Sequence, residues 1–500
     1  MSVAAAIAEL DHERLVEKYL ELHHQYEWLK RQFFGKKSER ILREENASKQ
    51  LSLGEGYEPE EIAPSPQTNV KAYERSHRKN EVKFSEGECK LRFDESVPVQ
   101  EIRVENRAVE GLSEDEYEVI GEEVAHKLAQ RPGAYVVLKY IRPVVKLKST
   151  GEISTAPVSQ AAAVIERSLA EVSFIVGLLL DKFLYHLPLY RQHQRLSASG
   201  VQINRMTLTN LVHRAAQILE PVYCALQSSI LLSHVLALDE TPIKAGRKVR
   251  GKMHQGYLWG MYGDKDELAF LYSSTRSGKL IKEYLNGFVG TLLTDGYRVY
   301  EQFAAQRGEI LHAQCWVHAR RKFFDAQTAE PELAGRALEL IGTLYEIEKT
   351  CSQQERSKEA LPVVDEFFGW LKEIFQKQAL LPSSPFTKAA SYALGREAAL
   401  RAFLSDEKVQ LDTNHLEQQI RPVAIGRKNW LFHWTETGAE YSAIIQSLIA
   451  SCRLQEINPY TYLIDVLQRV QTHPINDIQL LTPRLWKENF AYQTLSSDLR

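Results

Sequence analysis

The sequence lacks paired cysteines and any apolar run long enough to cross a bilayer. Its longest apolar run, near residues 174–180, is far shorter than the ~20 residues that a membrane helix needs. The N-terminal stretch carries charges early, where a secretory signal would have an apolar block. The five cysteines are Cys89, Cys224, Cys315, Cys351 and Cys452. Their scatter, without a C-x-x-C pair, predicts reduced thiols, and we therefore expect a cytoplasmic protein with no membrane partner.

A strong excess of charge of one sign is also missing, because the formal net charge is only −3. This excludes a polycation that would bind nucleic acid through its overall charge, so any DNA binding must depend on local basic patches. A chain of 500 residues is too long for one ordinary core. With 44% hydrophobic and 25% charged residues, the composition is that of globular domains. We therefore predict a multidomain α+β protein.

Apolar residues near the N-terminus alternate spacings of four and three, as in a coiled coil of about three heptads. They are Leu15, Tyr19, Leu22, Tyr26, Leu29 and Phe33. We predict a coiled-coil helix over residues 1–43, whose basic end (GKKSERILR) is either a DNA-backbone contact or a solvated face. The apolar seam either packs on its own protein or joins copies of the chain; the second is favoured because nothing nearby can cover it, and it predicts a homo-oligomer. Residues 44–82 are polar and contain prolines, which predicts a flexible linker.

Two modules are expected next. Residues 83–157 alternate like strands and predict a small β-rich module. Residues 158–230 have helical spacing, with a short turn at Gly200 before a helix that begins near Thr207. This outline is that of a helix-turn-helix, although helical hairpins that serve only packing share it. The side chains expected to face DNA are Arg191, Gln192, Arg195, Asn204, Arg205 and Asn210.

The central stretch places acids at the ends of predicted buried strands. Asp239 follows the apolar run 234–238, and Asp295 follows the run 289–294. Strand ends are where side chains reach a crevice, and paired aspartates there are typical of a divalent-metal site for phosphoryl chemistry. Each aspartate alone could instead belong to a turn. Asp264 and Asp266, in a predicted hairpin turn, are expected to be solvated.

A third acid lies far along the chain. Asp412, Thr413 and Asn414 are helix-capping residues, and a helix that starts there puts Asn414, Glu417 and Arg421 on one face. Pro422 is expected to bend or end this helix. The basic residues Arg421, Arg427 and Lys428 are candidates for contacting DNA phosphates. Three carboxylates can supply the oxygen ligands for two Mg²⁺ or Mn²⁺ ions.

The order of elements decides between these interpretations. Three strands in a meander are followed by alternating helices and strands, which is the ribonuclease-H-like order and puts acids on the first strand, after the fourth and on a late helix. We expect this catalytic core at residues 231–328 and 409–455, interrupted by a helical insertion at 329–408. Residues 456–500 are predicted to form a C-terminal helix and tail.

Several segments resemble bacterial insertion-sequence transposases of the family numbered 66, in the Asp-Asp-Glu superfamily. They are LKRQFFGKKSER, HLPLYRQ, LDETP, TDGYRVYE, CWVHARRKF, NHLEQQIRPVAIGRKNWLF and the SLIASCR-to-YL tail. The resemblance implies that Asp239, Asp295 and Glu417 are the catalytic metal ligands and that Arg421 and Lys428 contact phosphate. It also implies that accessory proteins of the same element cooperate, and that Cys315 and His318 support the site structurally.

Zinc is not expected. Cys315, His318 and His312 lack an evident fourth ligand. Members of this family usually carry paired C-x-x-C motifs before the helical segment, whereas residues 88–157 of this chain offer only Cys89 and His126. The β-rich module must therefore be held by packing. A basic cluster, Arg320, Arg321 and Lys322, is a further candidate for contacting the DNA backbone.

The function expected from these features is DNA transposition. The protein would bind the terminal inverted repeats of its element, cut to expose a 3′-hydroxyl, and join that hydroxyl to target DNA. Two alternatives remain: a nuclease of the same fold without strand transfer, and a DNA-binding repressor whose catalytic site has decayed.

Overall fold

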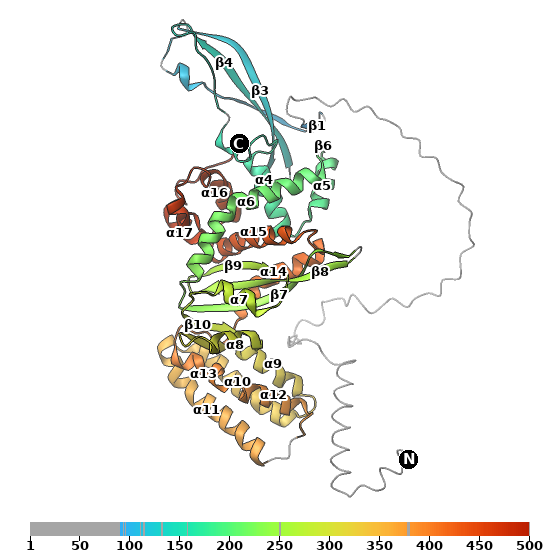
Figure 1. Cartoon of the computed structure of the whole chain (residues 1–500), viewed down its shortest axis with the longest axis vertical. Helices are drawn as coiled ribbons and strands as arrows, with labels where there is room; N and C mark the ends of the chain where they lie inside the picture. The colour runs from blue at the N-terminus through green and yellow to red at the C-terminus, as the bar shows by residue number, and fades with distance from the viewer. Residues whose placement is uncertain are drawn as a thin grey trace, which may run out of the picture.

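The computed structural model describes residues 91–499 apart from 94, 96, 111, 114–115, 132–133, 158, 250–251 and 378–380. The predicted coiled coil and linker therefore lie outside the described residues. The rest forms an elongated molecule in which a β hairpin, a helical layer, a sheet and a second helical layer follow one another along the long axis (Figure 1). Among the described helices, none is both long and apolar enough to span a membrane.

The β-rich module is built on one long hairpin. Its strands are β2 (Val99–Arg103), β3 (Tyr117–Arg131), β4 (Ala134–Leu147) and β5 (Ile153–Thr155). β3 and β5 pair antiparallel with β4, and β2 pairs parallel with it. Leu138 and Tyr140 are fully buried in a small core of this module, and the Tyr140 hydroxyl donates to Asp498 Oδ2 at 2.7 Å. Apolar packing and the C-terminal tail therefore hold the module.

A helical layer separates this module from the central sheet. Its helices are α4 (Val172–Phe183), α5 (Leu189–Ala198), α6 (Arg205–Ile230), α15 (Glu436–Leu454), α16 (Pro459–Arg469) and α17 (Pro483–Asn489). α5 and α6 are joined through Gly200, whose φ of +82° favours glycine. The short strand β6 (Val201–Gln202) in this turn pairs with β1 (Arg92–Phe93). The helix-turn-helix outline is thus present as α5, a turn and α6.

The central sheet has the strand order β11-β10-β7-β8-β9. Its strands are β7 (Val235–Val249), β8 (Lys252–Gly263), β9 (Glu267–Ser273), β10 (Gly290–Thr294) and β11 (Ile310–Gln314). β7, β8 and β9 form an antiparallel meander, whereas β10 and β11 continue the sheet parallel to β7. Alternate residues of β7 enter different cores: Leu236 and Leu238 face one, and Val235 and Ala237 the other. Burial on both faces explains why these strands read as continuous apolar runs.

Helices alternate with the later strands and then form a separate bundle. They are α7 (Gly278–Tyr284), α8 (Arg298–Ala305), α9 (Trp316–Ala326), α10 (Pro331–Thr350), α11 (Gln353–Lys377), α12 (Pro385–Leu394) and α13 (Glu397–Ser405). In the bundle, the fully buried Trp316 packs against Phe367, Phe368 and Phe403. The chain then returns to the sheet as α14 (Asn414–Trp430). α14 does not end at Pro422, because the helix runs eight residues beyond it, from Pro422 to Trp430.

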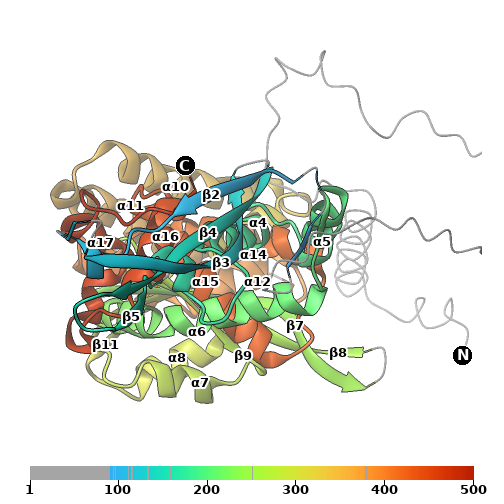
Figure 2. The same ribbon diagram turned by 90° about the horizontal axis from the view of Figure 1, so that it is seen from above.

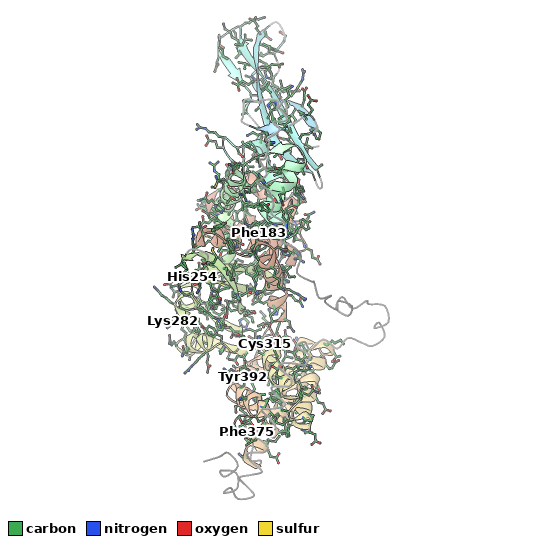
Figure 3. The ribbon with its side chains drawn as sticks, turned by 90° about the vertical axis from the view of Figure 1, so that its right-hand side faces the viewer. Phe183, His254, Lys282, Cys315, Phe375 and Tyr392 are labelled. Atoms are coloured by element: carbon green, nitrogen blue, oxygen red, sulfur yellow. The ribbon has the colours of Figure 1, made fainter. Side chains whose placement is uncertain are left out.

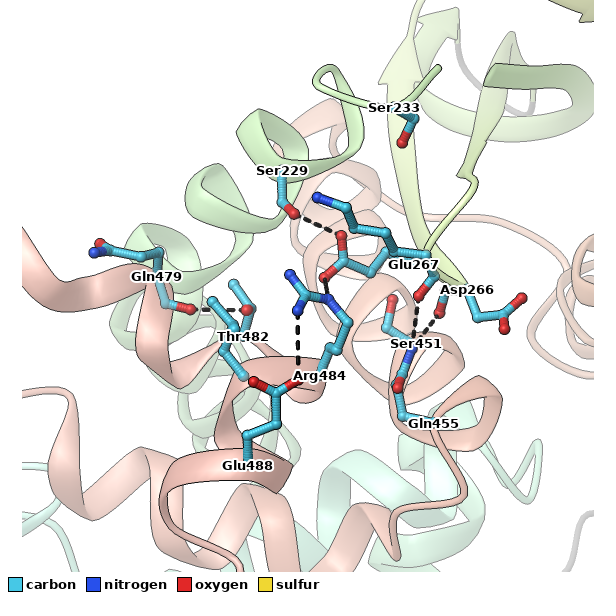
Figure 4. A network of polar contacts seen from close by, with 12 residues as sticks. Ser229, Ser233, Asp266, Glu267, Ser451, Gln455, Gln479, Thr482, Arg484 and Glu488 are labelled. Carbon is cyan, nitrogen blue, oxygen red and sulfur yellow. Dashed lines mark hydrogen bonds and ion pairs between the residues drawn. The ribbon is translucent and has the colours of Figure 1, made fainter. Parts of the chain in front are cut away.

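The C-terminal segment is bound to the edge of the sheet by a buried acid (Figure 4). Glu267 on β9 is 1% exposed. It accepts hydrogen bonds from Arg484 Nε at 3.0 Å and from Ser229 Oγ at 2.6 Å, so it joins α17 and α6 to the strand. Ser451 of α15 accepts a hydrogen bond from the amide of Leu268 at 2.9 Å and donates one to its carbonyl at 2.8 Å. The helical layer and the sheet are therefore one packed unit.

Candidate active site

The two aspartates lie side by side on neighbouring parallel strands. β7 and β10 pair in a register that puts Leu238 opposite Thr294, so Asp239 comes next on β7 and Asp295 comes directly after the end of β10. The amide of Glu240 donates to Asp239 Oδ1 at 2.8 Å, and the amide of Tyr297 donates to Asp295 Oδ1 at 2.8 Å. Backbone bonds therefore orient both carboxylates at the same edge of the sheet.

Glu417 reaches this edge because α14 crosses β7 and β8 closely. Gly260 of β8 pairs directly with Asp239. A Cβ at Gly260 would lie 3.0 Å from Leu416 Cδ1 and 3.5 Å from Ile420 Cδ1, so the missing side chain leaves room for α14. Leu416 is fully buried against the sheet, and Glu417, the next residue, is half-buried beside it. The glycine thus determines how near the third acid comes.

The start of α14 is attached to the start of α9. Cys315 is buried, and its Sγ accepts a hydrogen bond from the amide of Thr413 at 3.4 Å. The amide of Trp316 donates to Leu411 O at 3.0 Å. Burial raises the pKa of the Cys315 thiol to about 11, so the thiol stays neutral. Cys315 lies between the sheet and the helical bundle (Figure 3). These contacts fix the end of the helix that carries Glu417.

The pKa of Asp239 depends on burial and on the neighbouring acids. The pKa of Asp239 is raised to about 7, first by burial and then by the charge of Glu240, with further contributions from Asp295 and Glu417. The hydrogen bond from the Glu240 amide opposes this rise. Within the described part of the chain, the ion-pair partner of the three acids is His318, whose Nε2 lies 3.9 Å from Glu417 Oε1. No Lys or Arg among the described residues forms an ion pair with them, although the charge of Arg276, which pairs with Glu240, also acts on Asp295.

This donor set fits a hard divalent cation. Carboxylate oxygens are the ligands that Mg²⁺ prefers, and Mg²⁺ keeps several waters while using only one or two carboxylates. As the side chains stand, no three His, Cys, Asp or Glu residues of the described chain form a ready-made metal group. The three acids would have to move closer together to share a cation. Asp239, Asp295 and Glu417 are the residues that would hold the ions.

Glu240 is a site residue that the sequence analysis missed. Its carboxylate is 3% exposed, pairs with Arg276 and accepts a hydrogen bond from the Tyr300 hydroxyl at 2.8 Å. Burial raises the pKa of Glu240, while the bonds from Tyr300 and Arg276 oppose this rise. Arg276 also lies 4.0 Å from the ring centre of Tyr297, the residue whose amide binds Asp295. The sequence did offer a signal, because two acids follow each other at Asp239 and Glu240. Consecutive strand residues face opposite sides of the sheet, so Glu240 had to point into the other layer and find a partner there.

The basic residues near the acids differ in how they are held. Arg427 donates to Thr241 Oγ1 at 2.8 Å and to the carbonyl of Pro242, so it joins α14 to β7. Arg421 and Lys428 are exposed on the same helix. On α9, Arg321 and Lys322 are exposed, and Lys322 Nζ lies 4.5 Å from the ring centre of Tyr392; Arg320 is half-buried. Arg427 therefore has a structural contact that its position in the sequence did not reveal.

The residues expected to contact DNA from the helix-turn-helix also include some that are held by structural contacts and some that are exposed. Gln192 is fully buried and donates to Leu187 O at 2.9 Å, so the expectation that it faces DNA is wrong. Arg195 is half-buried, pairs with Asp181 and donates to the Tyr135 hydroxyl at 2.7 Å. Asn204 caps α6 by accepting from the Met206 amide at 2.9 Å. The exposed side chains of the set are Arg191, Asn204, Arg205 and Asn210.

Comparison with known proteins finds similar sequences over most of the chain. A family model described as "Transposase IS66 family" matches residues 167–441, and one described as "IS66 C-terminal element" matches 447–483. A third, "Transposase C of IS166 homeodomain", matches residues 21–102. Similar curated proteins come from Sinorhizobium fredii (strain NBRC 101917 / NGR234). Uncharacterized protein y4hP is 30% identical over 406 residues, covering 74% of this chain and 72% of its own length. Uncharacterized protein y4jD is 31% identical over 398 residues, covering 74% and 76%.

Proposed function

This chain belongs to the IS66 family of transposases, and from that premise we propose that it cleaves DNA at the ends of its element and joins them to target DNA. We assign the five-stranded sheet to the catalytic core of a ribonuclease-H-like Asp-Asp-Glu enzyme. The strand order supports this, because an antiparallel meander is extended on the side of its first strand by two parallel strands. The acids stand on the first strand, after the fourth, and on a late helix.

One observation carries the proposal: three acids distant in sequence influence one another, and none of them forms an ion pair with a Lys or Arg of the described chain. The charges of both Asp295 and Glu417 contribute to the raised pKa of Asp239, which supports one electrostatic cluster of the three acids. Clustered carboxylates in a half-buried site cost folding free energy because like charges repel. Such a cost is typical of a site that binds cations.

The proposed reaction needs no covalent enzyme intermediate. Divalent cations held by Asp239, Asp295 and Glu417 would supply activation of the attacking oxygen and stabilisation of the leaving oxygen. A water first attacks the phosphodiester at the element end and releases a 3′-hydroxyl. That hydroxyl then attacks a target phosphodiester in line, so one P–O bond forms as another breaks. Arg421 and Lys428 are assigned to the DNA phosphates, and Cys315 and His318 to holding α9 and α14.

The binding of DNA ends is assigned to the helical layer. Arg191, Asn204, Arg205 and Asn210 are exposed around the turn between α5 and α6, where a helix-turn-helix meets DNA. We assign phosphate contacts on the bundle side to Arg320, Arg321 and Lys322. Holding two terminal inverted repeats at once requires a homo-oligomer, and accessory proteins of the element would assist.

An end-cleavage and joining assay with Mg²⁺ or Mn²⁺ tests this function. Its substrate is the DNA that flanks the gene, and the proteins are the full chain, its Asp295→Asn variant and Glu301→Gln, an exposed acid on α8. Joined product from the wild type and Glu301→Gln, lost in Asp295→Asn, supports transposition. Cutting without joining would indicate a nuclease. Binding without either, also in the presence of the element's accessory proteins, would indicate a repressor with a decayed site.

A further inference from the structure

A basic cleft lies at the far end of the β7–β8 hairpin, away from the acids. It has a volume of about 620 Å³ and is lined by Lys244, Lys248, Lys252, Met253, His254, Gln255, Leu431 and Phe432. The hairpin projects from the side of the molecule (Figure 2), and His254 lies at that margin in Figure 3. The second wall is the segment that follows α14. The cleft therefore lies between β7, which carries Asp239, and the end of α14, which carries Glu417.

The charge of this cleft is of one sign. No acidic residue lines it, and its three lysines are exposed. In the part of the chain that the structure describes, none of the three lysines has an ion-pair partner. His254 Nδ1 is buried and has no hydrogen-bond partner among the described residues. Three free ammonium groups and an unused imidazole nitrogen favour an anionic ligand with hydrogen-bonding groups.

Aromatic surface lies beside the lysines. Phe432 lines the cleft, and its ring is 5.0 Å from that of Trp434 at an interplanar angle of 88°. Trp434 is 68% exposed and adjoins the cleft through Phe432 without lining it, whereas Leu431, which does line it, is 63% exposed. Aromatic side chains beside cations are the arrangement with which proteins hold unpaired nucleotides, whose bases stack while the phosphates meet the charges. In a duplex the base faces are covered by their neighbours, so the aromatic part of the cleft favours single-stranded DNA.

The aromatic segment is rigidly placed. Leu431 has φ +65° and ψ −47°, and the Phe432 amide donates to Trp430 O at 2.7 Å, which makes a strained γ-turn. The following residue, His433, bonds β7 through its amide to Lys244 O at 2.8 Å and through its carbonyl to the Gly246 amide at 3.1 Å. Strain of this kind persists only where the surroundings impose it, and it is common at ligand sites. Lysines and aromatic rings are thus held in one fixed arrangement.

The distance from the acids is set by the two shared elements. Lys244 is five residues beyond Asp239 on β7, which spans ~17 Å at about 3.3 Å per strand residue. Leu431 is fourteen residues beyond Glu417, which spans ~21 Å at 1.5 Å per helical residue. Where the strand between the two sites keeps the stacked spacing of B-form DNA, ~3.4 Å per nucleotide, these distances correspond to about five or six nucleotides.

We propose that this cleft binds unpaired nucleotides of a DNA strand about five or six positions from the phosphate that is cut. The lysines hold the phosphates, and a base stacks on Trp434 or Phe432. This inference rests on the proposed function, because it places the cleft on the path of DNA through the catalytic core. It extends that function by assigning a single-stranded segment next to the cleavage point.

Fluorescence anisotropy of the full chain tests the cleft. The probes are a labelled 12-nucleotide single strand and the matching duplex, without divalent cations. Trp434→Ala should weaken single-strand binding by about 5- to 100-fold and duplex binding by less than about twofold. Tyr492→Ala, which removes another exposed ring, is the matched control and should leave both unchanged. Because Trp434 is exposed, the thermal midpoint of the variant should equal that of the wild type.

The lysines are tested through the salt dependence. Replacing Lys244, Lys248 and Lys252 by Gln should lower the slope of log affinity against log salt by about 2 for the single strand. Lys358→Gln, an exposed lysine of α11, should not change it. A photo-crosslinking base placed five or six nucleotides from the cut should react with the segment 431–434.

The outcomes separate this proposal from the proposed function. If Trp434→Ala leaves single-strand binding unchanged, or weakens duplex binding equally, or if the wild type binds no single strand, the cleft assignment is wrong. Asp295→Asn should keep single-strand binding and lose cleavage. Cleavage that persists in Asp295→Asn would instead overturn the catalytic assignment, whatever the cleft binds.

Discussion

Two acidic regions of the central sheet have opposite surroundings: Glu267 on β9, and the three acids Asp239, Asp295 and Glu417 near the ends of β7 and β10 and on α14. Glu267, on β9, is 1% exposed and is matched by Arg484 Nε at 3.0 Å and Ser229 Oγ at 2.6 Å. Asp239, Asp295 and Glu417 are also partly or largely buried, but they face one another. Burial, then the charge of Glu240, and then the charges of Asp295 and Glu417 raise the pKa of Asp239 to about 7. The first arrangement joins elements of the fold, whereas the second opposes folding unless a cation enters.

This contrast supports the proposed site more strongly than any single acid does. A buried carboxylate without a cationic partner costs free energy, so a fold selected only for stability would pair it or remove it. Three partly buried carboxylates without a Lys or Arg ion pair at one edge of the sheet fit the proposed cation site. Glu240 stands between the two groups, because it lies beside Asp239 but has Arg276 and Tyr300 as partners.

The largest effect is expected from Asp295→Asn. Losing one metal ligand should reduce cleavage by about 1,000-fold or more, since metal stabilisation of the transition state is worth several kcal/mol. The free energy of unfolding should stay equal or rise, because one of three repelling charges is removed. Rates from single-turnover cleavage and denaturant unfolding of the same samples measure both. A destabilised Asp295→Asn protein would contradict the comparison.

Glu267→Gln should show the reverse pattern. Breaking a buried ion pair should lower the free energy of unfolding by up to about 3 kcal/mol, because Arg484 keeps its charge with only the exposed Glu488, 3.5 Å away, as a partner. Cleavage per folded molecule should stay within about twofold of the wild type, since Glu267 is remote from the acid cluster in the sheet order. The double variant Glu267→Gln/Arg484→Met should recover part of the lost stability. A large loss of cleavage rate in folded protein would break the distinction.

Glu240→Gln should combine both behaviours at a smaller scale. Loss of the charge that holds Arg276 should disturb Tyr297, whose amide orients Asp295, and reduce cleavage by about tenfold. The Mg²⁺ concentration for half-maximal rate should also rise, which a purely structural role would not cause. Glu240→Asp should restore part of the rate. An unchanged Mg²⁺ dependence with a tenfold slower rate would remove Glu240 from the site.

The smallest effects distinguish Arg427 from Lys428. Arg427→Lys should cost about 1 kcal/mol of stability, because a lysine cannot keep both bonds to β7. Lys428→Gln should leave stability unchanged and lower the salt slope of duplex binding by about 1. Denaturant unfolding and anisotropy at several salt concentrations separate them. Equal effects of both variants on stability would contradict the structural role of Arg427.

The chain order and apolar runs predicted the strands of the core and the acids at their ends. This worked because strands buried on both faces leave a continuous apolar pattern, and because Asp239 and Asp295 follow such runs directly. The helix of Glu417 was visible from its capping residues. What no local pattern revealed were partners distant in sequence: Arg276 and Tyr300 around Glu240.

Burial of polar residues was equally hidden. Gln192 has the exposed, polar character of its neighbours in sequence, yet it lies in the core and bonds backbone carbonyls. Arg427 lies after Glu417 on the same helix, which predicted a contact with DNA phosphate, yet its guanidinium binds β7. Both outcomes depend on which elements pack together, and such packing is set by the tertiary fold rather than by spacing along the chain. The assignment of the three acids as metal ligands remains a prediction.

The most direct test of this assignment is Mn²⁺ binding to the DNA-free protein, measured by electron paramagnetic resonance. The proteins are the wild type, Glu417→Gln and Glu267→Gln. The account predicts that the wild type and Glu267→Gln, each folded, bind Mn²⁺ with equal affinity, whereas Glu417→Gln binds at least about tenfold more weakly. Equal binding by Glu417→Gln would show that the acids do not form one metal site, and would contradict the account.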